Sequence, residues 1–291
     1  MNDVREYSLD EIVATLEELV KRPHVSPDYV RFRVELLKAQ DAVRAAQRLI
    51  APSPTAGDEP FDPDEIVSDP AALAKLLAAL QEAGGTPEEH DDQLGRLREV
   101  AGARPGLLLD IVKRAAFRPE DANVAALADE LDVSPDVLVF AARVLAAPLV
   151  ADRGDWRRVP GNDKPRNRRC DDYHCPTCNS SAGLALLIED EGRRVLCCSL
   201  CGQQWGFRRL ACPRCGNRDQ DALGKILVTD QDTRWIEICD ACNGYIKTID
   251  TRELATGPNT LAIAEDVATL HLDLLAEKEG YRRNPPYTAL V

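Results

Sequence analysis

Apolar residues recur at helical spacing through the first 150 residues of the chain. Between residues 9 and 19 they return every three or four positions, and Ser8 with Glu11 forms a capping-box signal at the start of this segment. The pattern predicts a helical domain, with further helices at 27–50, 69–83, 87–102, 105–117, 120–131 and 135–150.

The second half of the chain contains two stretches in which apolar and polar residues alternate. GLALLIEDEGRRVLCC and GKILVTDQDTRWIEIC each read as strand, turn and strand, which predicts two β-hairpins. A final helix is expected over 261–283. Its apolar face should be buried between the hairpins and the helical domain, and it consists of Leu261, Val267, Leu270, Leu274 and Leu275.

The distribution of cysteine divides the chain. All ten cysteines lie between Cys170 and Cys242, and the first 150 residues contain none. We therefore expect a multidomain protein that combines an α-helical domain with two small tandem β domains of the zinc-ribbon kind. The expected boundaries are a helical domain at 1–155, a basic linker at 156–172, metal ribbons at 173–208 and 209–252, and a C-terminal helix and tail at 253–291 that packs back on the core.

Charge is distributed unevenly along the chain, whose formal net charge is −13. Residues 1–150 contain 28 acidic and 16 basic side chains, whereas residues 151–291 contain 21 and 20. Because nucleic-acid binding needs Lys and Arg gathered on one face, this balance disfavours a nucleic-acid partner. We interpret the basic segment at 156–169 as a solvated linker, with a local anion or partner site as the alternative.

The sequence shows neither a secretory signal nor a membrane span. The N-terminal residues carry acidic side chains and no apolar run. The most apolar stretch, residues 137–151, contains Arg143 and Pro148 and is too short to cross a bilayer. We therefore expect a cytoplasmic protein without membrane insertion. Because thiols stay reduced in the cytoplasm, clustered cysteines there indicate metal binding before disulfides.

Eight of the ten cysteines form four C-x-x-C pairs. The first two pairs are separated by 19 residues and the last two by 23, close to the spacing of zinc ribbons. Each pair is followed by Asn or Gly, which most readily adopt the left-handed backbone that ends such a turn. The pairs are CPTC (175–178), CSLC (198–201), CPRC (212–215) and CDAC (239–242), followed by Asn179, Gly202, Gly216 and Asn243.

A hairpin brings the turns at its two ends together, so we assign one four-cysteine metal site to each hairpin. A cross-braced arrangement, in which the first pair shares a metal with the third, stays open as the alternative. Cys197 should point to the opposite strand face and fill the core, and Cys170 and His174 lie outside the spacing. The expected ligands are Cys175, Cys178, Cys198 and Cys201 at the first site, and Cys212, Cys215, Cys239 and Cys242 at the second.

Dithiol redox chemistry of the thioredoxin kind is a competing interpretation of the pairs. That motif normally occurs once, at a helix N-terminus beside a βαβ unit, whereas this chain has four copies flanking hairpins. Four thiolates in a closed tetrahedron leave no position for water, which argues against hydrolysis at the metal. Such a set suits zinc and also a single iron, and the spacing does not choose between them.

Residues 127–145 mimic a helix-turn-helix. The segment in the place of the recognition helix carries one basic side chain, Arg143, where base and phosphate contacts need several. We interpret this segment as a core helix. The sequence contains no Gly-rich phosphate loop and no convincing Ser/His/Asp arrangement, so we expect no catalytic residues and no enzymatic activity.

We call each C-x-x-C pair with its turn a knuckle. The four knuckles are similar to those of the formate dehydrogenase accessory (formation), or FdhE-like, protein family, and so are the segments ICDACNGYIKTID (238–250) and EDVATLHLDLLAEKEGYRR (265–283). The resemblance covers roughly residues 170–283. It implies an α-helical domain followed by two rubredoxin-like domains, and a cytoplasmic factor that active formate dehydrogenase requires. Carried over by position, the family's knuckle cysteines are the eight named above, and the resemblance favours iron over zinc.

These expectations combine into a hypothesis of function. The protein would be a non-enzymatic maturation factor with two metal ions, each bound by four cysteines, and its partner would be the immature catalytic subunit of formate dehydrogenase. A zinc-ribbon protein that binds nucleic acid and a rubredoxin-like electron carrier are the alternatives. The sequence predicts no oligomeric state.

Overall fold

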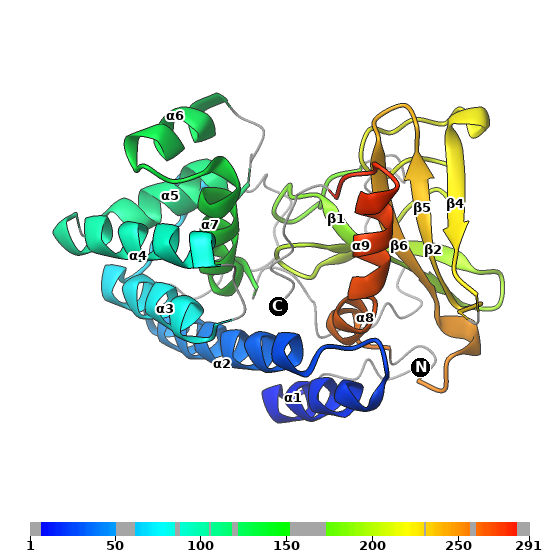
Figure 1. Ribbon diagram of the computed structural model, residues 1–291, viewed down its shortest axis with the longest axis horizontal. Helices are drawn as coiled ribbons and strands as arrows, with labels where there is room; N and C mark the ends of the chain where they lie inside the picture. Colours follow the sequence, from blue (N-terminus) through cyan, green and yellow to red (C-terminus); the bar gives the residue numbers. More distant parts are fainter. Residues whose placement is uncertain are drawn as a thin grey trace.

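The fold combines a helical region with a single small sheet. Figure 1 shows helices α2 to α7 on one side of the molecule, the strands on the other, and helices α8 and α9 against the sheet. This arrangement confirms the expected fold class. The computed structural model describes residues 7–50, 62–84, 88–104, 106–117, 122–151, 173–229, 231–256 and 260–283, without the side chains of 48–50 and 122.

Helices make up most of the described N-terminal region, close to their predicted positions. The capping box at the start of α1 is present, because Glu11 N–H donates to Ser8 Oγ at 3.2 Å and Ser8 N–H donates to the Glu11 carboxylate at 2.9 Å. The basic linker at 156–172, with Cys170, lies outside the described residues. The elements are α1 (Leu9–Glu18), η1 (Leu19–Lys21), α2 (Pro27–Ile50), η2 (Pro63–Glu65), α3 (Pro70–Glu82), α4 (Glu88–Ala103), α5 (Leu107–Ala115), α6 (Ala122–Glu130) and α7 (Pro135–Val150).

Helix α7 lies at the centre of the helical region. It contacts α2, α3, α4, α5 and α6, and 12 of its 16 residues are buried. A helix enclosed in this way has no face left for a nucleic acid, so its interpretation as a core helix is confirmed. Within the described chain, no helix alone has the length and apolarity of a membrane span; α6 and α7 pass that test only as a pair, bent by 99°.

Six strands form one mixed sheet in the order β3-β2-β1-β6-β5-β4. Pairing is antiparallel within β1–β2–β3 and within β4–β5–β6, whereas β1 and β6 pair in parallel. The strands are β1 (Ala182–Ile188), β2 (Arg193–Cys198), β3 (Gln204–Gly206), β4 (Leu223–Leu227), β5 (Arg234–Cys239) and β6 (Gly244–Asp250), with η3 (Gln220–Ala222) and η4 (Thr251–Glu253).

Each predicted hairpin therefore gains a third strand. We call residues 173–206, with β1 to β3 and the first two knuckles, the first unit, and residues 212–250, with β4 to β6 and the last two knuckles, the second unit. The parallel pairing of β1 with β6 joins the two units into one sheet.

The C-terminal segment forms two helices, α8 (Ala262–Ala268) and α9 (Leu270–Lys278), so the single helix predicted over 261–283 is wrong. At Thr269 the backbone leaves the helical region, and its Oγ1 donates to the Glu265 carbonyl at 2.6 Å. The restart rotates the buried face: Leu272 is buried, whereas Leu274 is 62% exposed against prediction. Helix α8 contacts α1 and β1, and α9 contacts β5 and β6.

The main hydrophobic core runs through the helical region, the first unit and α8. Leu145 of α7, Leu196 of β2 and Val267 of α8 all belong to it. The second unit has a smaller cluster of its own, in which Ile236 and Leu272 meet between the sheet and α9. The first unit is thus continuous with the helices, while the second is held mainly by the sheet and α9.

Candidate metal centres

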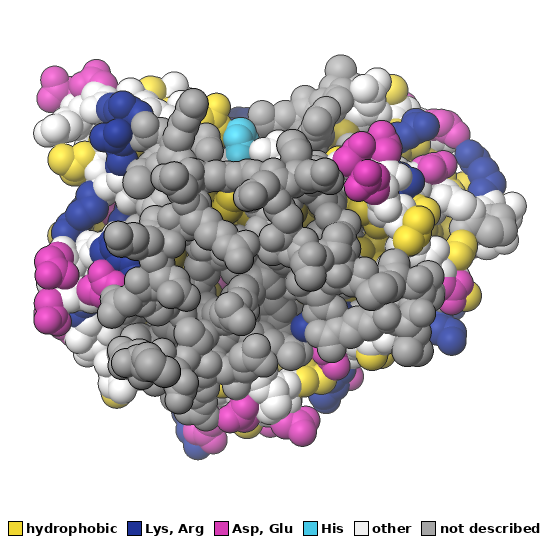
Figure 2. Space-filling model, turned by 180° about the vertical axis from the view of Figure 1, so that it is seen from behind, with side chains coloured by type: hydrophobic (Ala, Val, Ile, Leu, Met, Phe, Trp, Pro, Cys, Tyr) yellow, Lys and Arg dark blue, Asp and Glu magenta, His cyan; other side chains and the backbone are white. Residues whose placement is uncertain are grey.

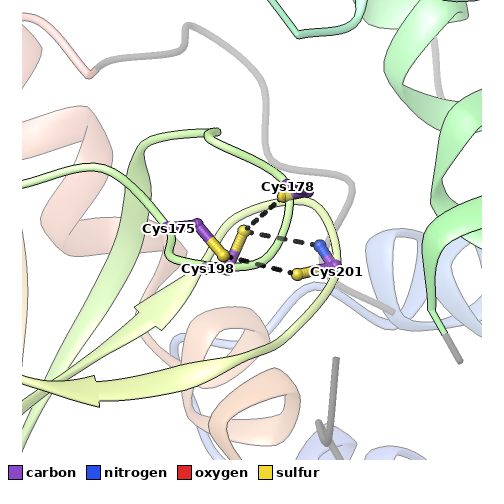
Figure 3. A group of neighbouring side chains, drawn as sticks. All are labelled: Cys175, Cys178, Cys198 and Cys201. Carbon is purple, nitrogen blue, oxygen red and sulfur yellow. Dashed lines mark hydrogen bonds between the residues drawn. The ribbon is translucent and has the colours of Figure 1, made fainter. Parts of the chain in front are cut away.

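Four cysteine sulfurs converge in the first unit, at the end of a loop before β1 and in the turn after β2 (Figure 3). The Sγ atoms of Cys175 and Cys201 lie 3.6 Å apart, and those of Cys178 and Cys198 lie 3.5 Å apart. A tetrahedron with metal–sulfur bonds of about 2.3 Å has edges of roughly 3.8 Å. The spacing therefore suits a metal ion, and it is far beyond that of a disulfide bond, about 2.05 Å.

The second unit repeats this geometry. The Sγ atoms of Cys212 and Cys242 lie 3.8 Å apart, and those of Cys215 and Cys239 lie 3.9 Å apart. In each group all four sulfurs fall within 4.8 Å of one another. The structure thus brings the first pair together with the second and the third with the fourth; it does not show the cross-braced arrangement. Each group could hold one zinc or iron ion.

The knuckle turns form because of local backbone bonds. All four leave through a residue with positive φ, as predicted: Asn179 at 58°, Gly202 and Gly216 at 72°, and Asn243 at 50°. In three of them the first cysteine N–H donates at 2.8 Å to the carbonyl five residues on, which closes the turn.

Backbone N–H groups inside these turns point at sulfur. Thr177 N–H lies 3.4 Å from Cys175 Sγ and Leu200 N–H lies 3.4 Å from Cys198 Sγ. Arg214 N–H takes the same place 3.4 Å from the Sγ of Cys212. Donors placed in this way stabilise the thiolate form that a metal ion requires.

The thiols of the first group are enclosed, and their pKa values reflect this. Burial raises the pKa of Cys175 and of Cys201 well above the usual range. Burial acts in the same direction on Cys198, but hydrogen bonds from the neighbouring thiols and from the Cys201 N–H hold its pKa well below the usual range. One thiolate is therefore favoured without a cation, and four thiolates require a metal ion at their centre.

Arg143 connects α7 to the first cysteine group. Its guanidinium is 1% exposed and donates to the Ala116 carbonyl at 2.9 Å, to Ser180 Oγ at 3.1 Å and to Ser199 Oγ at 2.7 Å. Both serines belong to the first unit, and Ser199 lies inside the CSLC knuckle.

The charge of Arg143 is costly to bury, and the cysteines offset part of that cost. Burial lowers the pKa of Arg143 to about 10, while interactions with the Cys198 and Cys178 thiolates oppose this lowering. A divalent ion in four thiolates leaves two negative charges, which an adjacent arginine partly balances. Sequence reasoning missed this contact; its signal was a lone arginine in the apolar stretch 137–151.

Cys197 and His174, which lie outside the knuckle spacing, do not join either group. Cys197 is 1% exposed and packs on the opposite strand face in a cluster with Leu184 and Ile249, as predicted. Burial raises the pKa of its thiol well above the usual range, so it stays a neutral core side chain. His174 pairs by backbone with Ser181 and belongs to neither cysteine group.

A buried charge network ties β6 to the C-terminal helices. Lys247 Nζ lies 2.8 Å from Asp266 and 2.7 Å from Asp273, and Arg283 lies 2.6 Å and 3.0 Å from the same carboxylates. Burial opposes ionisation, but Arg283 and Lys247 hold the pKa of Asp266 well below its usual range. Sequence reasoning missed this network too; its signal was two acidic residues seven positions apart in a segment expected to be buried.

Residues 196–290 match the family model described as "FdhE, C-terminal domain". An FdhE homologue from Aquifex aeolicus is 35% identical over 111 residues, which are 37% of this chain and 38% of the relative. One from Shewanella oneidensis is 31% identical over 46% of this chain and 41% of its own length. The chain thus spans about two fifths of these two relatives.

Two further comparisons extend over most of the chain. An FdhE homologue from Stutzerimonas stutzeri is 29% identical over 280 residues, which cover 92% of this chain and 85% of the relative. The crystal structure of the FdhE protein from Pseudomonas aeruginosa matches with a TM-score of 0.55 and 22% identity, over 99% of this chain and 98% of that one. At this identity the structural likeness shows a shared fold. The resemblance noted in the motifs is therefore confirmed: the chain is similar to FdhE proteins, in sequence over residues 196–290 and in fold to the crystal structure.

Proposed function

We propose that this protein is a non-catalytic accessory factor in the formation of formate dehydrogenase, acting in the cytoplasm on the immature catalytic subunit of that enzyme. The observation that carries the proposal is the match of residues 196–290 to the FdhE C-terminal domain, because this segment contains six of the eight knuckle cysteines. The names of the relatives, which are FdhE homologues, support the same conclusion.

In this proposal each cysteine group holds one metal ion, and iron is preferred to zinc. The ligands are Cys175, Cys178, Cys198 and Cys201 in the first unit and Cys212, Cys215, Cys239 and Cys242 in the second. A closed set of four sulfurs supplies a rigid cross-link to each unit and, with iron, a site for one electron. The sulfurs leave no position for water or substrate, which supports a role without catalysis.

The proposed units of function are the helical domain at 1–155, the ribbons at 173–208 and 209–252, the linker at 156–172 between helices and ribbons, and the C-terminal segment at 253–291. The core shared by the helices and the first unit supports their acting together as one platform. The second unit, with its own smaller core, would then extend from that platform.

The test is to tag the chain in its native cell and identify what co-purifies. The wild type should recover the catalytic subunit of formate dehydrogenase, and two metal ions per chain should be found by elemental analysis. The Cys212→Ser/Cys215→Ser variant should lose one ion and show whether the second site is needed for recovery. Absence of the dehydrogenase from the wild-type sample would overturn the proposal.

A rubredoxin-like electron carrier is the second candidate. It is favoured by Cys215, which is exposed, because electron exchange with a partner needs a metal site near the surface. Anaerobically purified protein should then absorb visible light and bleach on reduction. A colourless protein that contains only zinc would rule this candidate out.

A further inference from the structure

A pocket of about 260 Å³ lies beside the second cysteine group. One wall is the segment 209–214, which leads from β3 into the second unit, and the other is formed by β4, β5 and β6. Cys212 and Cys239 contribute to the lining. An ion held by four sulfurs that lie within 4.8 Å of one another occupies far less than this volume. The pocket therefore extends beyond the metal site.

Strand register explains why this face of the second unit is open. Lys225, Glu237 and Ile246 form one cross-strand row that lines the pocket. The next residue along each strand points to the opposite face, where Ile236 packs in one cluster with Leu272 of α9. Helix α9 thus covers one face of the three strands, and the pocket lies on the other.

Three basic side chains line the pocket: Arg209, Arg214 and Lys225. The two arginines donate to backbone carbonyls, each at 3.2 Å, and Lys225 Nζ lies 4.5 Å from the centre of the Trp235 ring. Within the part of the chain that the structure describes, none of the three forms an ion pair with a carboxylate. The charges of Arg214 and Lys225 are therefore available to a ligand, whereas that of Arg209 also acts on the Asp250 carboxylate.

The pocket stays positive when its other charges are counted. Its one acidic lining residue, Glu237, is already paired with the buried Arg194 at 2.6 Å. A divalent ion in the second cysteine group would leave two negative charges. Three cations against two negative charges leave at most about one positive charge in excess, because Arg209 also acts on Asp250. This sign is opposite to that of the whole chain, whose net charge is −13.

Apolar side chains stand next to these cations. Leu210, which lines the pocket, is 62% exposed, and Leu227 at the end of β4 is 72% exposed. Figure 2 views the molecule from behind, so the second unit lies at its left edge, where hydrophobic, basic and acidic side chains occur together. Exposed leucines among unpaired cations suit a surface that binds a segment of opposite charge.

We propose that this pocket is the docking site for an acidic and apolar segment of a partner protein. The inference rests on the proposed function, so the partner is the catalytic subunit of the dehydrogenase. A carboxylate of that segment pairs with Lys225, and an apolar side chain lies against Leu210. The pocket takes one or two side chains, because sites for drug-sized ligands measure roughly 300–1,000 Å³. Docking here places the partner over the second cysteine group.

The test compares two double variants of the full chain in binding to the catalytic subunit. Leu210→Ser with Lys225→Glu changes the pocket. Leu274→Ser with Lys75→Glu is the matched control, because Leu274 is also 62% exposed and Lys75 is an exposed lysine, on α3. We expect the pocket variant to bind about tenfold or more weakly and to lose salt dependence, and the control to bind as the wild type does.

Each outcome separates the two proposals. If the wild type binds the subunit and the pocket variant binds equally well, the docking site is wrong and the proposed function stands. If the wild type does not bind the subunit, both are wrong. Equal weakening of the control variant would show a general charge effect and would also overturn the docking site.

A second measurement leaves the pocket almost unchanged. A photo-crosslinking amino acid at position 210 should form a crosslink to an acidic segment of the subunit, whereas the same group at position 274 should form none. Bound subunit should also slow the loss of the second metal ion to a chelator without slowing the loss of the first. Crosslinking at 274 alone, or protection of both ions alike, would contradict docking at this pocket.

Discussion

The two units share their knuckle geometry and differ in what surrounds it. In the first unit all four knuckle cysteines are at most 3% exposed and lie in the main core, where Arg143 approaches from α7. In the second unit Cys215 is exposed and Cys242 is partly exposed. A C-x-x-C knuckle thus determines how a metal is held, while the surrounding elements determine whether it is part of the core or open to a partner.

The largest expected effect comes from removing ligands in the enclosed unit. Cys178→Ser with Cys198→Ser removes two sulfurs from the main core, where a structural metal contributes on the order of 10 kcal/mol to folding. We expect the helices to unfold as well, because they share this core. The measurement is thermal unfolding followed by the helical circular dichroism signal, together with metal content.

The corresponding change in the second unit is the control. Cys215→Ser with Cys239→Ser should release one metal ion and leave most of the helical signal and its melting temperature intact. Loss of helical structure to the same extent in both variants would remove the distinction between the units.

A substitution at Lys247 tests the contact between the shared sheet and the C-terminal helices. It lies on β6, which pairs with β1 of the first unit and β5 of the second, and its side chain is completely buried between Asp266 and Asp273. Lys247→Met removes one of the cations that contact the two buried carboxylates and keeps Arg283. This loss should lower the free energy of unfolding by about 3–5 kcal/mol. Urea unfolding measures this, and the exposed Lys75→Met should stay within about 0.5 kcal/mol of the wild type.

A substitution at Arg143 tests the contact between α7 and the first cysteine group, which the second group lacks among the described residues. Arg143→Met keeps an apolar stem but removes donors to Ser180, Ser199 and the Ala116 carbonyl. We expect the free energy of unfolding to fall by about 2–3 kcal/mol, and the first metal ion to be released faster to a chelator. In the wild type the second ion should leave first, because its cysteines are more exposed. If Arg143 only packs the core, stability will fall while the ratio of the two release rates stays unchanged.

The smallest expected effect is a pH dependence at the edge of the second unit. His271 of α9 contacts Gln231 at 3.0 Å and the His24 ring at 4.3 Å, and burial, then His24, lowers its pKa to about 4. The unfolded chain therefore binds the proton first as pH falls from about 6.5 towards 4, so stability is lost in that window.

His271→Gln should flatten that loss. Because the imidazole is partly exposed, we expect the free energy of unfolding, measured with urea, to fall between pH 7 and pH 5 by about 1 kcal/mol less in the variant than in the wild type. The same pH slope in both proteins would show that another group titrates.

The knuckles could be predicted from the sequence because everything that forms them is local. A knuckle depends on the spacing within its pair and on an exit residue such as Asn179 or Gly202, and its hairpin brings it to a second knuckle only a few tens of residues away. The helices followed from apolar periodicity for the same reason. The break at Thr269 did not, because one threonine in a helical pattern gives no stop signal until its hydroxyl finds the Glu265 carbonyl.

The long-range features could not be predicted from the sequence. The parallel pairing of β1 with β6 joins segments more than 60 residues apart, and either hairpin could have closed on its own without it. Arg143 and Lys247 carried no periodic signal, because a buried charge is recognised only by the partners that fold around it. The pocket arises where the chain between the units crosses the second one, which no local pattern records.

The strand order gives the two units a polarity. The first strand of the first unit pairs with the last strand of the second, so the units repeat head to tail, without a two-fold axis between them. Head-to-tail contacts form a ring only where the rotation between copies closes, and otherwise they leave an open end. The outer edge of β4 corresponds to the edge of β1 that β6 occupies, and among the described residues β4 pairs with β5 alone. A third copy of the unit would extend the sheet at β4 through the same parallel pairing, so the sheet is a two-member segment of an open array.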